Sequence, residues 1–443
     1  MNGSSIPAWL VPLFLVLMPG AAFAGTPEPF VSASSVEQTA GQIRKLPQDD
    51  IWWTVNGPDM AWNNRNLNRI YPTVNVYRAG QVRELEYQPE PGTANFEVDT
   101  PGGRMGFRTF LDSDQSSTMG VVILHRGRIV FEHYPRQQPY EKMLFWSVTK
   151  IFVTTLVAIL EDRGLVDTAL PVEHYVPELK GSTWAGIRIR NILDMASGVD
   201  CPDEYVDKSS CYYGYSASIG EGFRDASSPD NPYDYLSSLR APRFAEQGTS
   251  YSYSGPNAFI AGWLVEKVTG MPFQDALSRE VWTKIGAEND AAIWAPRYAI
   301  PITSGGLLAR VRDVARFGLL FTPSRHVVSD EKIVSARYLE LLLEGGNPAL
   351  LERALLGRDP ESGEYRFGNA RGTGVRHTAY VWTVFENDDI YMGGWAGQGL
   401  LVNPKRDLVA AWTGYFREDG TAIPVLPMIR AIGDGLYGSV AEE

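Results

Sequence analysis

The sequence predicts an α/β (α+β) fold in which both ends of the chain supply one layer of strands and the middle supplies helices. Two runs rich in β-branched and apolar residues lie around a glycine turn within 119–133. Residues 165 to about 316 lack strand alternation and carry helical stretches, and strand-like runs return within 380–413. The helical part is therefore expected to be an insertion in a discontinuous strand layer.

The first 24 residues are typical of a secretory signal. They contain no charged side chain, and their apolar segment Ala8 to Met18 is too short to span a bilayer. They end in Ala22-Phe23-Ala24, a small-x-small cleavage pattern. We expect a signal peptide over 1–24 and a periplasmic or secreted protein; an uncleaved membrane anchor is the alternative.

Residues 25–106 are rich in Pro, Asn and Gly and show little periodicity beyond short helical or extended pieces. We interpret them as an N-terminal segment that wraps the main domain. The net charge of −12 argues against nucleic acid or an anionic membrane surface as a partner. The oligomeric state does not follow from the sequence.

The stretch Phe145 to Lys150 and the apolar run after it predict a buried helix. Ser147 is a residue type that caps helices, and Gly164 is suited to a left-handed stop. Ser147 and Lys150, at i and i+3, share one face. Because apolar residues cover nearly the whole circumference, Lys150 is expected to be buried, which favours its neutral amine and suits it to act as a base towards Ser147.

A structural interpretation of the same pair is a capping serine followed by an exposed lysine. A second S-x-x-K match, at Ser329 to Lys332, lies in a charged stretch with no apolar helix behind it, so we interpret it as solvated surface. Metal chemistry has little support, since there is no H-E-x-x-H and the five histidines are scattered. We expect no metal and no cofactor.

The two cysteines, Cys201 and Cys211, lie close together in a polar loop. In an exported protein they are expected to form a disulfide, and closing so short a loop contributes about 3 kcal/mol in the chain-entropy model. Two free thiols are the alternative. The loop continues into an aromatic excursion, 205–250, whose tyrosines either pack or form a rim around a pocket.

Six ordered stretches resemble the serine β-lactamase and penicillin-binding superfamily, and more narrowly its class C-like esterase and 6-aminohexanoate-dimer hydrolase branch. The resemblance rests on residues 120–132, 145–150, 192–198 (Ile-Leu-Asp-Met-Ala-Ser-Gly), 251–270, 304–308 (Ser-Gly-Gly-Leu-Leu) with Asp313, and 394–398 (Gly-Trp-Ala-Gly-Gln). It implies a β-lactamase-like serine hydrolase domain over 107–443. In that domain an antiparallel sheet layer (about 107–164 and 365–443) is flanked by helices and carries an inserted all-helical domain (about 165–364).

The resemblance also implies roles for individual residues. The family's second motif, Tyr-x-Asn, falls on Tyr253-Ser254-Gly255, so Tyr253 is the candidate proton shuttle and Gly255 replaces an amide that contacts substrate and lysine. The third motif falls on Met392-Gly393-Gly394, where the basic residue is missing. The backbone amides of Ser147 and Trp395 are the candidate oxyanion hole, and Gly255, Gly394 and Gln398 are candidate substrate contacts.

These residues predict a serine hydrolase that cleaves a small amide or ester through an acyl-enzyme on Ser147. A penicillin-binding D-alanyl peptidase or β-lactamase is one alternative, which the missing basic residue makes less suited to penicillins. A catalytically silent binding protein with the same fold is another, because two of the three motifs are altered.

Overall fold

The computed structural model describes residues 35–359 and 361–438. The predicted signal peptide, 1–24, lies outside these residues. The chain separates into two units, 1–44 and 45–443. In the first, the described part is essentially one helix, α1 (Val36–Arg44), which has no buried residue. In the second, no described helix has both the length and the apolar character needed to cross a bilayer.

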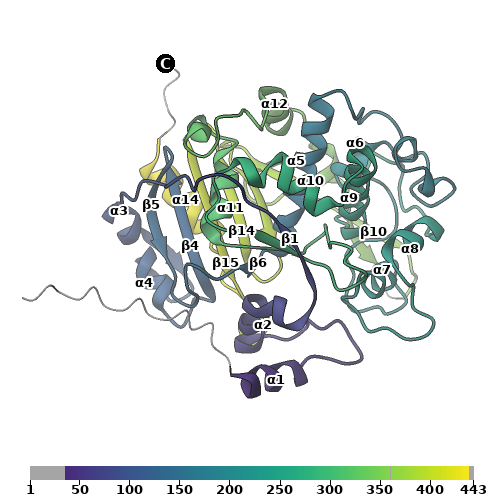
Figure 1. Ribbon diagram of the computed structural model, residues 1–443, viewed down its shortest axis with the longest axis horizontal. Helices are drawn as coiled ribbons and strands as arrows, with labels where there is room; N and C mark the ends of the chain where they lie inside the picture. The colour runs from purple at the N-terminus through teal and green to yellow at the C-terminus, as the bar shows by residue number, and fades with distance from the viewer. Residues whose placement is uncertain (1–34, 360, 439–443) are drawn as a thin grey trace, which may run out of the picture. The chain divides into compact units, whose positions relative to one another are not determined.

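The main sheet has seven antiparallel strands in the order β11-β12-β13-β14-β15-β4-β5. Strands from both ends of the chain therefore share one layer, as predicted, and in Figure 1 blue β4 and β5 lie beside yellow β15 and β14. The strands are β4 (Thr118–His125), β5 (Arg128–His133), β11 (Val375–Ala379), β12 (Trp382–Phe385), β13 (Ile390–Gly394), β14 (Gln398–Asn403) and β15 (Leu408–Gly414).

Both faces of this sheet are covered. Because side chains alternate along a strand, Val121 and Ile123 of β4 face one apolar cluster with α4 and α14, while Val122 and Leu124 face the larger core with α5 and α11. Helix α11 lies close to the sheet at Gly318, where a Cβ would come within 2.5 Å of Val409. Burial on two faces explains why these strands have continuous apolar sequences.

The predicted insertion is not purely helical, which corrects that expectation. It includes β7 (Ala291–Trp294) and β8 (Leu307–Ala309) in a second sheet of order β1-β7-β8-β6, and β9 (Ala354–Arg358), which pairs with β10 (Tyr365–Gly368). These strands are too short to show alternation in the sequence. The remaining helices of the insertion are α6 (Ile189–Leu193), α7 (Cys211–Ile219), α8 (Pro232–Ser238), α9 (Gly255–Thr269), α10 (Phe273–Glu280), α11 (Val311–Leu319), α12 (Ala336–Glu344) and α13 (Ala349–Glu352).

The N-terminal segment does more than wrap the domain. Its strand β1 (Thr73–Val76) pairs with β7, and β6 (Met143–Leu144) closes the other edge of that sheet. The segment's other elements are α2 (Gly57–Ile70), α3 (Pro91–Asn95), β2 (Glu97–Thr100) and β3 (Gly103–Gly106); α4 (Phe107–Asp112) follows, and α14 (Leu426–Leu436) is the predicted closing helix.

The helix behind Ser147 is α5 (Thr149–Asp162), and it is buried over residues 149–160. It ends as predicted: Gly164 has φ +69°, and the amides of Gly164 and Leu165 donate to the carbonyls of Glu161 and Leu160. The capping expectation for Ser147 is wrong. Ser147 lies inside a 3₁₀ turn, Trp146–Val148, and its side chain caps no helix.

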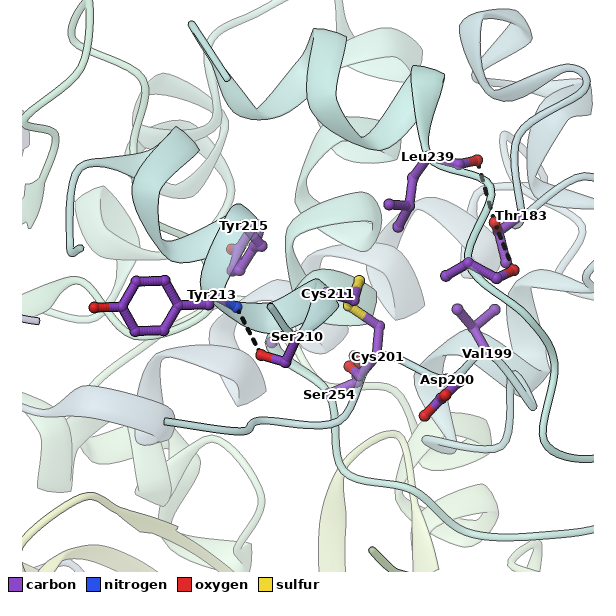
Figure 2. The surroundings of a disulfide bond; sticks show 12 residues. Thr183, Val199, Asp200, Cys201, Ser210, Cys211, Tyr213, Tyr215, Leu239 and Ser254 are labelled. Atoms are coloured by element: carbon purple, nitrogen blue, oxygen red, sulfur yellow. Dashed lines mark hydrogen bonds between the residues drawn. A yellow bond between two sulfur atoms is a disulfide. The ribbon is translucent and has the colours of Figure 1, made fainter. Parts of the chain in front are cut away.

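Cys201 and Cys211 form the predicted disulfide. Figure 2 shows the bridge between the 201–211 loop and the start of α7, where Ser210 accepts a hydrogen bond from the amide of Tyr213. A disulfide of this kind is typical of proteins in oxidising compartments.

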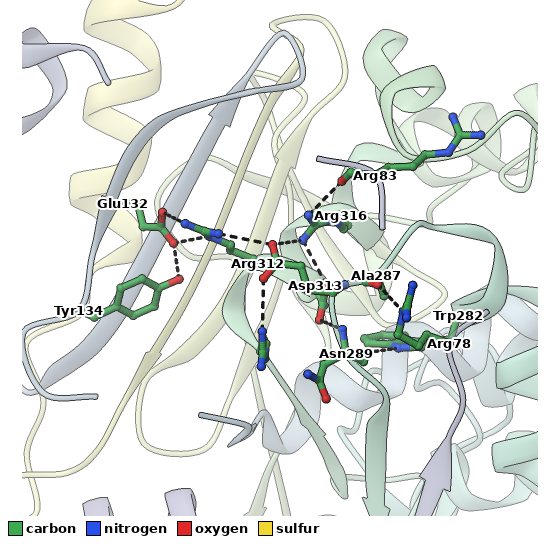
Figure 3. A network of polar contacts seen from close by, with 12 residues as sticks. Arg78, Arg83, Glu132, Tyr134, Trp282, Ala287, Asn289, Arg312, Asp313 and Arg316 are labelled. Atoms are coloured by element: carbon green, nitrogen blue, oxygen red, sulfur yellow. Dashed lines mark hydrogen bonds and ion pairs between the residues drawn. The ribbon is translucent and has the colours of Figure 1, made fainter. Parts of the chain in front are cut away.

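A buried polar network joins α11 to the loop before β7 (Figure 3). The guanidinium of Arg316 has no solvent exposure and contacts Glu288 at 2.9 Å and Asp313 at 3.1 Å. The Asp313 carboxylate also accepts hydrogen bonds from the amides of Glu288 and Asn289. The family-like Asp313 therefore ties a core helix to the smaller sheet rather than facing the region of Ser147.

Replacing Arg316 by Met should lower the free energy of unfolding by about 3 to 5 kcal/mol, because it leaves the buried carboxylate of Asp313 without its paired cation. Arg104→Met, which removes an exposed pair with Glu97, is the matched control and should cost less than about 1 kcal/mol. Denaturant unfolding of both variants checks this; equal midpoints would contradict the buried role of Arg316.

Candidate active site

The smaller sheet places the serine. Strand β6 pairs with β8, and the next amide, that of Phe145, donates to the carbonyl of Leu307 at 2.8 Å. Trp146 then adopts a left-handed φ of +47°, a costly conformation for a residue with a bulky side chain. Ser147 follows this strained residue and is partly exposed, whereas Trp146 and Val148 are buried.

Aromatic rings from the N-terminal segment hold Trp146. Its indole stacks on Trp52 and meets Trp53 edge-on, at centroid distances of 6.0 and 5.4 Å, and its N–H donates to Asn64 of α2 at 3.3 Å. The Trp146 carbonyl accepts a hydrogen bond from the Thr149 hydroxyl at 2.6 Å. These contacts maintain the strained turn before Ser147.

Lys150 is 1% exposed and lies next to Ser147, as predicted. Its Nζ is 2.9 Å from the Ser147 Oγ and donates to the Ser304 carbonyl at 2.6 Å. Burial lowers the pKa of Lys150 from 10.5 to about 8, against the negative charges of Asp203 and Glu221, which raise it. The interpretation of Lys150 as an exposed surface lysine is therefore wrong.

Tyr253 lies next to Lys150, with its ring centroid 4.7 Å from Nζ. Its hydroxyl oxygen is buried and makes no hydrogen bond of normal geometry with the described residues. The Ser147 side chain is nevertheless close enough to lower the pKa of Tyr253. Burial, followed by the charge of Asp203, raises that pKa well above its usual value. Tyr253 is thus a neutral phenol that can donate a proton.

Gly394 is the last residue of β13 and lies beside the serine turn, and Trp395 follows the strand. A Cβ at Gly394 would lie 2.4 Å from the carbonyl oxygen of Phe145, so only glycine permits this approach. Trp395 lines the pocket that contains Ser147, and its ring contacts Trp53 at 5.2 Å. The backbone of Gly394 therefore contacts the turn that carries the serine, and the ring of Trp395 forms part of the pocket wall.

Gln398 differs from the prediction. Its side chain is buried, its amide donates to the carbonyls of Trp395 and Gly414, and its oxygen accepts from the amide of Gly414. A contact with substrate would require breaking these bonds. In this structure Gln398 supports the turn that carries Trp395.

The pocket itself is small, with free space of about 20 Å³, enough for a water molecule. Four predicted residues line it: Ser147, Lys150, Gly255 and Trp395. Two tyrosines of the aromatic excursion, Tyr205 and Tyr212, also line it, as one of the two expectations for that excursion had it. The remaining lining residues were not predicted to face a pocket; they are Trp53, Trp146, Asp203, Glu221, Ser304 and Gly305. Aromatic rings close the opening, since Trp53, Tyr205 and Trp395 contact one another at 4.8 to 5.3 Å.

Two carboxylates and one basic residue lie among the described residues that line the pocket. Burial, with the charge of Asp203, raises the pKa of Glu221 to about 7. Burial also raises the pKa of Asp203, and Lys150 opposes that shift. Burial therefore disfavours the charged forms of both carboxyl groups, and Lys150 is the basic residue that opposes this effect among the described lining residues. Two sequence features could have drawn attention to the unpredicted pocket residues. They are the cysteine pair on either side of Asp203 and the tryptophan pair at 52–53.

The second S-x-x-K match has no comparable environment. Ser329 is buried, contrary to the surface interpretation, but Lys332 is exposed and the segment is not helical. Within residues 35–359 and 361–438, no group of three or more His, Cys, Asp or Glu side chains could hold a metal ion.

Comparisons with known proteins agree with the family resemblance. The model of the β-lactamase family matches residues 106–413. The 6-aminohexanoate-dimer hydrolase of Paenarthrobacter ureafaciens is 30% identical over 367 residues, which cover 82% of this chain and 86% of that protein. A β-lactamase of Providencia stuartii is 23% identical over 192 residues, which cover 41% of this chain and 44% of that protein.

Solved structures show the same fold. A Bacillus anthracis structure assigned as a 6-aminohexanoate-dimer hydrolase aligns with a TM-score of 0.71 at 20% identity, covering 88% of this chain and 95% of that one. A hydrolase described as having promiscuous acyltransferase activity, EstCE1, aligns with a TM-score of 0.57 at 15% identity, covering 75% and 96%. This chain is therefore a member of the β-lactamase family of serine hydrolases.

Proposed function

We propose that the protein is an amidase or esterase that forms an acyl-enzyme on Ser147. The observation that carries the proposal is the contact of a buried lysine, Lys150, with the Ser147 hydroxyl at 2.9 Å. A serine is a weak nucleophile unless a neighbouring base removes its proton, and a buried amine with a pKa of about 8 suits that task near neutral pH.

In the proposed reaction, the neutral amine of Lys150 takes the proton of Ser147 while Oγ attacks the substrate carbonyl. The resulting oxyanion binds the backbone amides of Ser147 and Trp395, each worth about 3 kcal/mol in such sites. Tyr253 gives its proton to the departing amine or alkoxide and recovers one from the Lys150 ammonium. Water then attacks the ester carbonyl while Lys150 accepts its proton, and Lys150 returns that proton to the Ser147 Oγ as the bond to the acyl group breaks and the acid leaves.

The pocket favours a substrate with a cationic group. Asp203 and Glu221 are partly or fully buried and face a cavity in which Lys150 is the one basic residue among the described lining residues. An ammonium group would balance their charge, and aromatic walls favour cations. An amide of two 6-aminohexanoate units, the substrate in the name of one relative, has an ammonium at its acyl end.

The same charge pattern opposes the penicillin alternative. Met392 is buried and occupies the place of the basic residue that would engage a substrate carboxylate. The described residues that line the pocket include two carboxyl groups and one basic residue, Lys150, so the pocket is poorly suited to an anionic β-lactam. We further propose that the protein works after export, since the disulfide and the small-x-small pattern at Ala24 both suit an oxidising compartment.

Intact mass measurement after exposure to a p-nitrophenyl ester or a fluorophosphonate should show one added acyl or phosphonyl group, which peptide mapping places on Ser147. Ser147→Ala should abolish the label, and Ser329→Ala, which alters the other S-x-x-K match, should retain it. Folded wild-type protein that stays unlabelled would favour the silent binding protein.

The rate of Ser147 acylation should rise with pH and reach half its maximum near pH 8, because the reactive amine forms only as Lys150 loses its proton. Below that midpoint the rate should fall about tenfold per pH unit. Lys150→Arg, which stays protonated, should lower the rate by roughly 100-fold or more across the range. A wild-type rate that does not change between pH 6 and 9 would exclude Lys150 as the base.

Glu221→Gln should lower kcat/KM for p-nitrophenyl 6-aminohexanoate by about tenfold at pH 8.5, because a charged contact worth about 1.5 kcal/mol or more is lost. The neutral hexanoate ester is the matched substrate and should change less than about threefold. Since burial raises the pKa of Glu221 to about 7, the preference for the cationic ester should weaken below pH 7. Equal losses with both esters would argue against cation recognition.

A further inference from the structure

The second motif lacks its amide side chain, and a residue from another loop fills that space. A Cβ built on Gly255 would lie 3.1 Å from the Asp203 Oδ1, and the Gly255 amide donates a hydrogen bond to that same oxygen. The carboxylate of Asp203 therefore occupies the space into which a side chain at position 255 would project.

Asp203 contacts both ends of the Tyr253–Gly255 segment. Its amide donates to the Tyr253 carbonyl at 3.3 Å, and its carboxylate accepts from Gly255. Its other carboxylate oxygen is 3.4 Å from the Tyr205 hydroxyl. The negative charge of the same carboxylate raises the pKa of Lys150. Asp203 therefore contacts the Tyr253–Gly255 segment and also acts on the proposed base.

The disulfide holds this loop in place. Cys201 is bonded to Cys211 at the start of α7, and its carbonyl accepts a hydrogen bond from Ser254 at 2.7 Å (Figure 2). Along the loop the side chains alternate, with Asp203 and Tyr205 lining the active-site pocket and Pro202 and Glu204 lining a separate cavity. The loop therefore separates the two cavities, and the disulfide fixes its Cys201 end.

We propose that Asp203, held by the Cys201–Cys211 bridge, is a positioning residue that replaces the side chain absent at Gly255 and aligns Tyr253 and Lys150 for proton transfer. The proposal rests on the proposed hydrolase function. Asp203 acts in two ways in this proposal. It aligns its neighbours through hydrogen bonds, which a neutral side chain such as Asn can also make, and it adds a negative charge, which a neutral side chain cannot supply.

The test measures the rate and pH profile of Ser147 acylation in four variants: Asp203→Ala, Asp203→Asn, Gly255→Asn, and Asp203→Ala combined with Gly255→Asn. Asp203→Ala should slow acylation at least tenfold. Gly255→Asn alone should also slow it, because the new side chain meets Asp203, Tyr212 and Tyr215 within 3.5 Å. The double variant should recover most of the rate, because removing the carboxylate opens space for the amide.

The pH midpoint separates charge from alignment. The charged groups that act on Lys150 are Asp203 and Glu221. The tyrosines around them stay neutral because burial raises their pKa: Tyr205, Tyr212, Tyr215 and Tyr253. Each variant without the Asp203 carboxylate should therefore have its midpoint at lower pH, including the double variant and Asp203→Asn. Asp203→Asn, which keeps a hydrogen-bonding side chain, should slow acylation less than Asp203→Ala does.

Glu204→Ala, on the other face of the loop, is the control and should match wild type. Replacing both cysteines by Ser should slow acylation in the wild-type background and have little further effect in Asp203→Ala, as expected for coupled groups. Wild-type rates and midpoints in folded Asp203→Ala, or no recovery in the double variant, would overturn the role of Asp203. Failure of the wild-type protein to label at Ser147 would instead overturn the hydrolase function and this inference with it.

Discussion

The active site depends on keeping one amine out of water. Lys150 lies in the first turn of a helix with no exposed residue over its first three turns, and its Nζ contacts a serine hydroxyl and a backbone carbonyl. Burial would favour the neutral amine much more strongly if no charges were near. Asp203 and Glu221 oppose that shift, and the balance leaves a base that changes protonation near pH 8.

Three separate parts of the chain maintain this environment. The smaller sheet supplies the serine turn and the Ser304 carbonyl, and the N-terminal segment supplies tryptophans that close the pocket and brace Trp146. The disulfide loop supplies Asp203 and Tyr205. The pocket is so small that substrate entry requires some of these aromatic side chains to move. Ser147 lies in a 3₁₀ turn and Lys150 in the helix that follows it, while the other lining residues come from loops, turns and helix starts.

Several features could be predicted from sequence because their signals are local. The apolar circumference of residues 151–160 predicts a buried helix, and Gly164 predicts its end. Strands β4 and β15 have apolar runs because both of their faces are covered. The short strands β7 and β8 were missed, since three or four residues show no period. Ser147 was misjudged as a cap because its residue type suits one, whereas the strained turn at Trp146 places it inside a 3₁₀ helix.

The sequence by itself predicted the contact of Ser147 with Lys150 and the order of the motifs, because the two residues are three positions apart and their relation follows from one helical turn. The tertiary structure decided what surrounds them. Trp53 comes from the N-terminal segment, and Asp203 and Glu221 come from two loops of the region after Cys201; no local pattern places their side chains in one cavity. The charge of the pocket and the pKa of Lys150 depend on the distances between these side chains, so only the folded structure determines them.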